Sequence, residues 1–504
     1  MKTTHAEDLP NRFQWAMVLI PLMGVLIMGL AASQITGARI HKDGQENLML
    51  ARNIARSGIF SLDHQTPLKP TNQREPLPPL VVAAHLQGLD RVAPEITKGE
   101  LGQGKAAYWL KVSNLYWVAL GVLGTVLLAQ SLTRSLPLIL LMMGLVGYLF
   151  LALPQVVDSL YTELQAGVLL IWSTWLLLMA WSRPGRRWPL LLGVSLGLLT
   201  LVKGVFLYVF PVLMAAEFVG VILGYSNRLR LLQRPFLLLL GMLIPLAPWL
   251  LRNWLVLGQA QFTQRGGHVL LTRAVKNRMS QAELPGALYF WGPSLYQKTS
   301  SLLGLGATRV DFQSGGRFQH LNREASADFY QADVRAQQEG RPEAAVSYYH
   351  KAAAQLERYR FEAIAAGHPK PDAAADRGAR RQAVMMIQEQ PIRHLWMSGV
   401  FAWRGIWSQP NQGVHFKSNG LYVIIKDAIA GLSYAALMLL FVLGLLRRHL
   451  PLIALTLLPV FLIAFYALFT HGLARYNSPA IPLMLISLVL VIDRVRPRRR
   501  GPEA

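Results

Sequence analysis

The sequence predicts an α-helical protein with about ten membrane-spanning helices, and its composition and apolar stretches carry this prediction. Hydrophobic residues make up 53% of the 504 residues and charged residues only 15%, a balance typical of multi-pass membrane proteins. The chain contains no cysteine, which excludes disulfides, thiolate metal sites and thiol nucleophiles.

Apolar stretches long enough, or nearly long enough, to cross a bilayer as helices recur along the chain. The first ends in "GLAAS" and resembles a signal peptide, but the preceding "MKTTHAEDLPNR" carries acids as well as bases. We therefore expect a retained membrane helix there, with a cleaved signal peptide as the alternative. The expected spans are residues 14–32, 108–130, 136–153, 164–181, 189–201, 205–223, 236–257, 421–446, 450–470 and 479–493.

Basic residues predict the orientation of these helices, because Lys and Arg accumulate in cytoplasmic loops. Loop 154–163 has no Lys or Arg, and the short loops around 202–204 and 471–478 have only Lys203 and Arg475. Both termini are therefore expected in the cytoplasm, and the net charge of +23 does not indicate nucleic-acid binding. The opposite loops hold Arg134, Arg183, Arg186, Arg187, Arg228, Arg230, Arg234, Arg447, Arg448 and the tail 493–500.

This topology predicts three parts of the chain. Residues 1–257 form an N-terminal membrane bundle with a first outer loop at 33–107. Residues 258–420 form a mainly helical extracytoplasmic domain, and 421–504 form the last membrane helices and a basic tail. Within the outer domain, "PEAAVSYYHKAAAQLERYRFEAI" predicts one amphipathic helix, followed by a proline-rich break at "HPKPDAAAD".

The outer domain ends in "MMIQEQPIRHLWMSGVFAWRGIWS", which mixes Trp396, Trp403 and Trp407 with Arg393 and Arg404. This composition favours a helix lying at the membrane interface with an aromatic belt. Stacking of sugars on the tryptophans is the alternative.

Two acids follow the first membrane helix, in "HKDGQENLML". Asp43 and Glu46 have the spacing of a capping box ahead of an amphipathic helix that Gly58 can end. A helix cap and a general base toward an acceptor hydroxyl are both open for Asp43.

A proline-rich motif, "REPLPPL", closes the first outer loop. Pro76, Pro78 and Pro79 are expected to hold an extended backbone and to exclude helix. The motif is either a stiff connection or a device that points Arg74 and Glu75 inward.

The second short outer loop contributes Asp158 and Glu163 at the start of a membrane helix, where helix-dipole stabilisation is the simpler explanation. Lys203, Arg252 and Arg475 lie at the same predicted membrane face, and cations at membrane depth are costly. They favour a lipid phosphate or pyrophosphate partner, with snorkelling to the interface as the alternative.

In this order, the motifs resemble those of the GT-C glycosyltransferases, specifically the relatives of protein O-mannosyltransferase and of the lipid A aminoarabinose transferase. The chain has Arg74-Glu75 where the aminoarabinose transferase has Glu-Lys, so either residue is a candidate for contact with the donor. It also lacks a "WWDYG" stretch, which argues against the oligosaccharyltransferase branch. The matching segments are the acidic loop after the first helix, "REPLPPL", "YTE", "PWLLRNWLVLGQAQFTQRGGHVLL" and "RYNSPAIPLM".

The resemblance implies a GT-C-like membrane bundle that transfers a sugar, with inversion, from a polyprenyl-phosphate donor to a lipid, glycan or protein acceptor. It implies the bacterial cytoplasmic membrane, no nucleic acid and no obligatory cofactor, with a divalent metal left open. The implied catalytic residues are Asp43, Asp158 and Glu163, and the implied substrate-binding residues are Glu46, Arg74, Glu75, Lys203, Arg252, Arg265, His268, Arg475 and Tyr476.

Three other functions are open from the sequence. A lipid-linked glycan ligase or polymerase would use Arg and His in outer loops, such as Arg265 and His268. A lipid-linked oligosaccharide flippase is disfavoured because the acids gather at one membrane face and not at the midplane. A membrane scaffold with an outer interaction domain is the third possibility, and it would give the acids of the outer loops no role except as helix caps.

Overall fold

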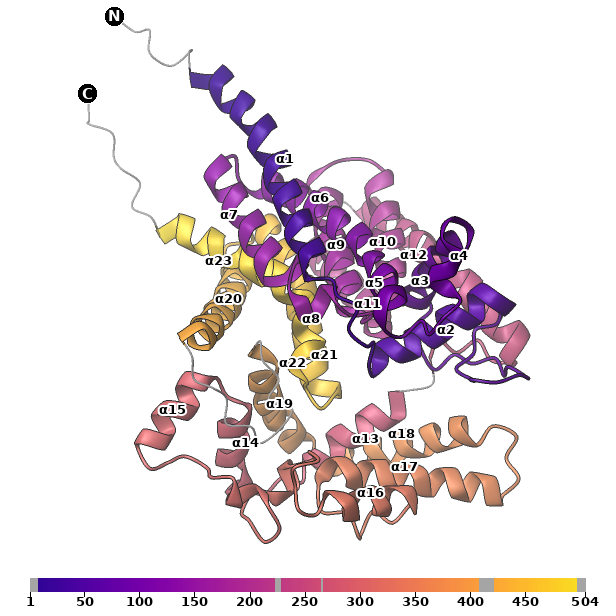
Figure 1. Cartoon of the computed structure of the whole chain (residues 1–504). Coiled ribbons are helices and arrows are strands. Elements are labelled where there is room, and N and C mark those ends of the chain that lie inside the picture. The colour runs from indigo at the N-terminus through magenta and orange to yellow at the C-terminus, as the bar shows by residue number, and fades with distance from the viewer. Residues whose placement is uncertain (1–7, 223–227, 264–265, 408–420, 496–504) are drawn as a thin grey trace, which may run out of the picture. The chain divides into compact units, whose positions relative to one another are not determined.

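The computed structural model describes residues 8–222, 228–263, 266–407 and 421–495. The described residues form helices and no strands, which confirms the predicted α-helical class. They divide into two compact units (Figure 1). Unit 1 comprises Met1–Phe262, Ala435–Val460 and Pro479–Ala504, and unit 2 comprises Thr263–Tyr434 and Phe461–Ser478.

Unit 1 contains both long apolar helices and shorter, more polar ones. They are α1 (Asp8–Gln34), α2 (Asp43–Ser57), α3 (Leu77–Val92), α4 (Pro94–Thr97), α5 (Gly104–Val112), α6 (Asn114–Leu132), α7 (Leu136–Val146), η1 (Gly147–Leu151), α8 (Pro154–Val157), α9 (Glu163–Ser182), α10 (Arg187–Val202), η2 (Gly204–Tyr208), α11 (Val209–Ile222), α12 (Arg228–Leu257) and α23 (Ile481–Val495). Helices α20 (Leu421–Leu446) and α21 (Leu450–Phe469) are each divided between the two units.

Seven helices among the described residues are long and apolar enough to cross a membrane. The shorter apolar helices Leu136–Leu151, Arg187–Val202 and Gly204–Val219 fall on the three remaining predicted spans. The chain is therefore a helical membrane protein, and ten crossings stay a prediction. The seven are Gln14–Gln34, Gly104–Leu132, Glu163–Ser182, Gln233–Leu257, Val423–Leu446, Leu450–Phe469 and Ala474–Arg494.

Small residues allow α10 and α12 to pack backbone against backbone. A Cβ atom on Gly193 would lie 2.2 Å from the carbonyl oxygen of Leu238, and one on Gly241 would lie 2.1 Å from that of Leu190. Lipid tails are as apolar as leucine, so membrane helices associate largely through such close packing. Alanine at Gly193 or Gly241 has no room unless the helices separate.

The first outer loop is mostly helical, and the expectation that its prolines exclude helix is wrong. Helix α3 begins at Leu77, so Pro78 and Pro79 lie in its first turn. Proline is tolerated there because the first N–H groups of a helix have no intrahelical partner. Helices α2 and α3 pack through Leu48, Ala51 and Val82.

The capping-box interpretation of Asp43 is also wrong. Helix α2 starts at Asp43, and the N-cap position is occupied by Lys42, which makes no side-chain capping bond. Asp43 and Glu46 thus lie in the first turn, one helical turn apart on the same face. Gly58 ends the helix in the left-handed conformation, as predicted.

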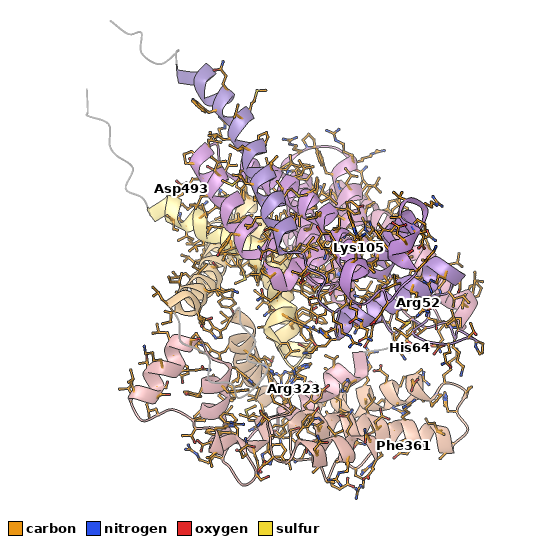
Figure 2. The ribbon with its side chains drawn as sticks, viewed as in Figure 1. Arg52, His64, Lys105, Arg323, Phe361 and Asp493 are labelled. Carbon is orange, nitrogen blue, oxygen red and sulfur yellow. The ribbon has the colours of Figure 1, made fainter. Side chains whose placement is uncertain are left out.

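Unit 2 is built from shorter helices, and side chains fill the space between its ribbons (Figure 2). Its main core combines aromatic residues of α14 and α19, including Trp291 and Phe401. A second core joins α13, α17 and α18 through small residues such as Ala352 and Ala379. The helices are α13 (Gly266–Lys276), α14 (Leu284–Trp291), α15 (Ser294–Leu302), α16 (Tyr330–Gln338), α17 (Tyr348–Ala365), α18 (Pro371–Glu389), α19 (Pro391–Ile406) and α22 (Ala474–Asn477).

Two helix boundaries in unit 2 differ from the expected ones. The helix expected over 342–364 begins only at Tyr348, because Ser347 caps it by accepting a hydrogen bond from the N–H of His350. The proline-rich break is shorter than expected, since Pro371 starts α18 and "PDAAAD" is helical.

Helix α19 presents one apolar face to the core of unit 2 and another outward. Met397 and Phe401 are fully buried, whereas Ile392, Leu395 and Trp396 are exposed. The indole of Trp403 donates to the carbonyl oxygen of Leu288 at 3.0 Å, so Trp403 serves the core and not an aromatic belt. An interfacial position of this helix stays a prediction.

Reporter fusions test the predicted orientation. We expect fusions near Arg186, between α9 and α10, and near Gly340 in unit 2 to report opposite sides of the membrane. Reporters on the same side would contradict the orientation and with it the extracytoplasmic placement of unit 2.

Candidate active site

The centre of the candidate site in unit 1 is an arginine that holds two carboxylates. The Nε of Arg74 donates to Glu46 Oε2, and its Nη2 donates to Asp43 Oδ1, both at 2.5 Å. Arg74 is 9% exposed, whereas the side chains of Asp43 and Glu46 are 30% and 37% exposed. The two carboxylates therefore remain accessible to solvent, whereas the buried guanidinium holds them in position.

The three groups carry a net charge of −1 when all are ionised, because two carboxylates share one guanidinium. Burial alone would lower the pKa of Arg74, but the hydrogen bonds and negative charges of Glu46 and Asp43 outweigh it and raise the pKa above its usual range. Arg74 thus stays charged and orients the acids without fully neutralising them.

The second outer loop packs against the same helix. The amide of Asn47, on α2, donates to the carbonyl oxygen of Leu160 at 2.8 Å. A Cβ atom on Gly44 would lie 3.5 Å from the backbone nitrogen of Leu160 and 3.6 Å from the ring of Tyr161. The first turn of α2 and the loop that contains Asp158 and Glu163 are therefore neighbours, as their predicted common sidedness requires.

Asp158 is held by groups that sequence reasoning did not single out. Its Oδ1 accepts from the N–H of Thr36 at 2.8 Å and from Lys111 Nζ at 2.9 Å, and its Oδ2 accepts from the Thr36 hydroxyl at 2.7 Å. Lys111 also donates to the carbonyl oxygens of Thr36 and Ala38. These contacts give Asp158 a structural role in tying the end of α1 to α5, and its catalytic role stays a prediction.

Lys111 was not identified from the sequence as part of this cluster, although its position there indicates a buried, paired lysine. It falls within the apolar stretch 108–130, where a lysine is costly unless it is paired. Its side chain is only 1% exposed, and Asp158 is its ionic partner.

Glu163 and Lys203 form a second ion pair in unit 1. Lys203 Nζ lies 3.4 Å from Glu163 Oε1, and both side chains are about nine-tenths buried. Lys203 occupies the junction between α10 and η2, the break that the sequence predicted. Glu75 Oε1 accepts from the N–H of Gly204 at 3.5 Å, so the residue after Arg74 reaches this junction.

Arg252 contacts the first outer loop. Its guanidinium donates to the carbonyl oxygen of Thr71 at 2.8 Å and lies 5.1 Å from the ring centre of Trp249 and 5.6 Å from that of Phe60. Lys203 and Arg252 therefore have different protein partners. Their convergence with Arg475, which belongs to unit 2, stays a prediction.

The remaining predicted binding residues belong to unit 2, and Arg265 lies outside the described residues. The N–H of His268 donates to Asp376 at 3.2 Å, and its ring meets that of Tyr349 edge-on at 6.4 Å. The guanidinium of Arg475 lies 6.0 Å from the ring centre of Tyr476. Tyr476 in turn meets the ring of His471 edge-on at 5.6 Å.

A search for metal sites over the described part of the chain finds no group of three or more His, Asp or Glu side chains placed to hold an ion.

Replacing Asp158 by Asn separates its two roles. An amide puts an N–H group where Oδ1 or Oδ2 now accepts, and it leaves the buried Lys111 without its ionic partner. We expect a loss of about 2 to 3 kcal/mol in the free energy of unfolding, measured by denaturation in detergent. The exposed Asp90→Asn variant should change it by less than about 0.5 kcal/mol. An Asp158→Asn protein of normal stability that has lost transfer would make Asp158 catalytic.

Comparison with known proteins gives matches among solved structures only, since no family model and no curated protein matches the chain. The chain is similar to the Archaeoglobus fulgidus oligosaccharyltransferase AglB in complex with an inhibitory peptide and a dolichol-phosphate, at 14% identity and a TM-score of 0.44 over 96% of this chain and 53% of that one. It is also similar to the same organism's enzyme tethered with an acceptor peptide containing the NVT sequon, at 12% identity and 0.43 over 95% and 49%.

A third structure, the A. fulgidus enzyme in complex with Zn and sulfate, matches at 12% identity and 0.42 over 94% and 49%. The chain thus spans about half the length of the proteins that it matches.

Proposed function

We propose that the chain is a membrane glycosyltransferase that moves a sugar, with inversion, from a polyprenyl-phosphate donor to an acceptor hydroxyl outside the bacterial cytoplasmic membrane. The observation that carries the proposal is the pair of part-exposed acids, Asp43 and Glu46, held by the buried Arg74 in the first turn of α2. Because two carboxylates share one guanidinium, the cluster keeps a net negative charge, and one of its carboxylates can accept a proton.

In the proposed reaction Asp43 is the general base. The acceptor hydroxyl gives its proton to the Asp43 carboxylate as its oxygen attacks the anomeric carbon. The bond between that carbon and the phosphate oxygen breaks on the opposite side, and the electron pair leaves with the polyprenyl phosphate. Arg74 holds the carboxylate in one orientation, so that less conformational freedom is lost in the transition state.

The leaving phosphate gains negative charge, and we assign its stabilisation to Lys203, Arg252 and Arg475. Nearby cations favour the transition state where charge develops in a water-poor site. Lys203 supports this assignment, because its contact with Glu163 is long, at 3.4 Å, and a phosphate oxygen competes readily with it.

A lipid-linked glycan ligase or polymerase differs from this proposal in what it releases. Such an enzyme breaks a pyrophosphate-linked donor and releases polyprenyl pyrophosphate, whereas the proposed transfer releases the monophosphate. A flippase forms no covalent product at all. Analysis of the released lipid therefore separates the three functions.

Deletion of the gene tests the proposal in the cell. Mass spectrometry of envelope lipids, glycans and glycoproteins is expected to show the loss of one sugar substituent and a build-up of its polyprenyl-phosphate donor. Complementation by the wild-type chain, but not by the Asp43→Asn variant, should restore the substituent. A deletion strain with an unchanged envelope and no accumulated donor would contradict the proposal.

A further inference from the structure

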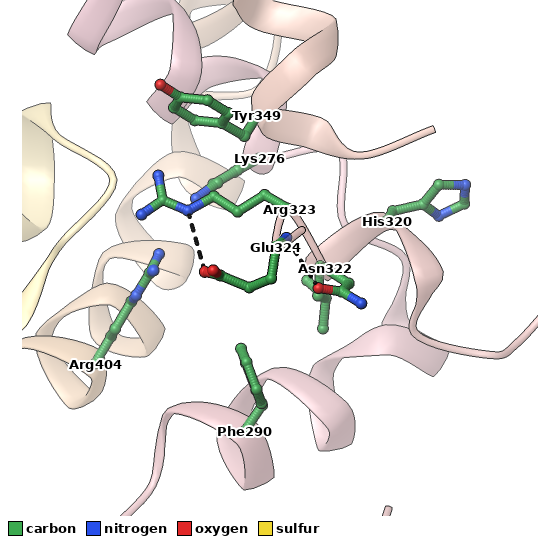
Figure 3. Close-up of a pocket in the computed structure, with 9 residues that line it drawn as sticks. Lys276, Phe290, His320, Asn322, Arg323, Glu324, Tyr349 and Arg404 are labelled. Atoms are coloured by element: carbon green, nitrogen blue, oxygen red, sulfur yellow. Dashed lines mark hydrogen bonds and ion pairs between the residues drawn. The ribbon is translucent and has the colours of Figure 1, made fainter. Parts of the chain in front are cut away.

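A second feature of the molecule, a basic pocket within unit 2, is not used by the proposed reaction. It is open to solvent: about 340 Å³ of empty space lies between its walls and the solvent, of which about 10 Å³ can hold the centre of a water-sized sphere. Its walls carry Lys276 from the end of α13, Arg323 from the segment before α16, and Arg404 from α19 (Figure 3). Two helices and one irregular segment, far apart in the sequence, thus bring three cations to one place.

Lys276 is buried without a counter-ion. It is 6% exposed, and no carboxylate among the described residues stabilises its charged form, since burial and the neighbouring arginines all disfavour it. Its ammonium group lies 6.0 Å from the ring centre of Trp291. The undescribed stretches of unit 2, 264–265 and 408–420, contain no Asp or Glu in their sequence. A buried ammonium in this state is costly unless an anion joins it.

The two arginines add positive charge around it. Arg404 donates to the carbonyl oxygen of His471 at 3.0 Å and lies 4.4 Å from the ring centre of Trp291. Arg323 covers the ring of Tyr349 at 4.7 Å. Burial, followed by the charges of Arg404 and Arg323, lowers the pKa of Lys276 well below its usual range. The cations therefore repel one another as the pocket stands.

Glu324 is the one acid among the described residues that line the pocket. Its Oε1 lies 3.9 Å from Arg323 Nε, and Figure 3 shows its carboxylate between Arg323 and Arg404. Three cations and one carboxylate leave a charge of +2 when all are ionised. The carboxylate of Glu324 thus shows a position in the pocket that favours an anion. It does not neutralise the positive charge of the three cations.

We infer that this pocket binds a phosphoryl group. A phosphate monoester carries a charge of about −1.5 to −2 at neutral pH, which matches the excess better than a single carboxylate does. Arginine presents paired N–H groups to phosphate oxygens, and lysine adds a point charge. Tyr349 and Phe290, which also line the pocket, offer apolar surface beside the anion. The phosphoryl group comes either from a polyprenyl lipid or from a free phosphate compound.

Binding is tested on the purified full-length chain in detergent without phosphate buffer. The probes are inorganic phosphate, pyrophosphate and farnesyl phosphate, with farnesol as the uncharged control. We expect at least one phosphate probe to raise Tm and to bind in calorimetry, and farnesol to do neither. Binding of farnesyl phosphate alone identifies the lipid source, and binding of the inorganic probes identifies a free phosphate compound.

The Lys276→Met variant removes the buried charge while keeping the length of the side chain. It should unfold at the same temperature as the wild type or higher without a probe, because an unpaired buried charge is lost. It should bind the phosphate probe at least about tenfold more weakly. Lys298→Met, at an exposed lysine of α15, should bind as the wild type does. If Lys276→Met does not fold, Arg323→Gln replaces it, since that side chain is 24% exposed.

Two results overturn the inference: a wild-type chain that binds none of the phosphate probes, or a Lys276→Met chain that binds them unchanged. The Asp43→Asn chain separates this site from the proposed reaction. It is expected to bind phosphate normally whether or not it transfers sugar, because Asp43 lies in unit 1 and the pocket is made of unit 2 residues alone.

Discussion

The Asp43→Asn variant is expected to fold normally and to transfer sugar about a hundredfold more slowly than the wild type, because an amide cannot accept the acceptor's proton. The amide oxygen of the new side chain can still accept from Arg74, whose Nη2 now donates to Asp43 Oδ1. Asp43 is 30% exposed, so the free energy of unfolding should fall by only about 1 kcal/mol or less. Initial rates and denaturation curves of the same preparation check both statements.

Glu46→Gln is the matched control for this variant. Glu46 lies one turn from Asp43, is similarly exposed and binds the same arginine. Its loss should therefore change the free energy of unfolding by about as much as the loss of Asp43. If Asp43 is the base, Glu46→Gln should lower transfer by less than about tenfold. Near-normal transfer by Asp43→Asn would leave Asp43 without a role as base. A larger loss in Glu46→Gln would assign that role to Glu46.

Loss of the arginine is expected to have the second-largest effect. In Arg74→Met the two acids of α2 face each other without their cation, and the orientation of Asp43 is lost. We expect a loss of about 2 kcal/mol in stability, which allows for the partial exposure of both acids. Transfer should fall at least about tenfold, because the base is no longer held in position.

A double variant separates repulsion from positioning. In Arg74→Met with Glu46→Gln only one charge remains, so much of the lost stability should return. Transfer should stay low, because Asp43 still lacks the guanidinium that orients it. A double variant that regains wild-type transfer would show that Arg74 only offsets charge. Denaturation and initial rates on the wild type, both single variants and the double variant give both readouts.

Local chemistry explains which parts of the site were predictable. Asp43 and Glu46 stand out because they follow the first apolar stretch, and Arg74 stands out because it precedes the proline-rich "PLPPL"; the structure joins all three. Lys203 stands out as a cation that interrupts an apolar run. The turn at "REPLPPL" was misread because prolines break a helix interior but suit its first turn, and the sequence alone does not tell the two positions apart.

The basic pocket of unit 2 was not predictable in the same way. Lys276, Arg323 and Arg404 are separated by dozens of residues, and no motif in the sequence links them. Their meeting depends on how α13 and α19 pack around the aromatic core, which periodicity does not specify. The role of Lys111 similarly depends on a contact with Asp158, 47 positions away.

The most direct test of the central claim is an assay of the purified wild-type chain with synthetic polyprenyl-phosphate sugars and an envelope extract as acceptor. The account predicts a covalent sugar product of inverted anomeric configuration and release of the polyprenyl monophosphate, with no product from nucleotide sugars. A folded wild-type protein that forms no product from any lipid-linked sugar, or that uses nucleotide sugars instead, would contradict it.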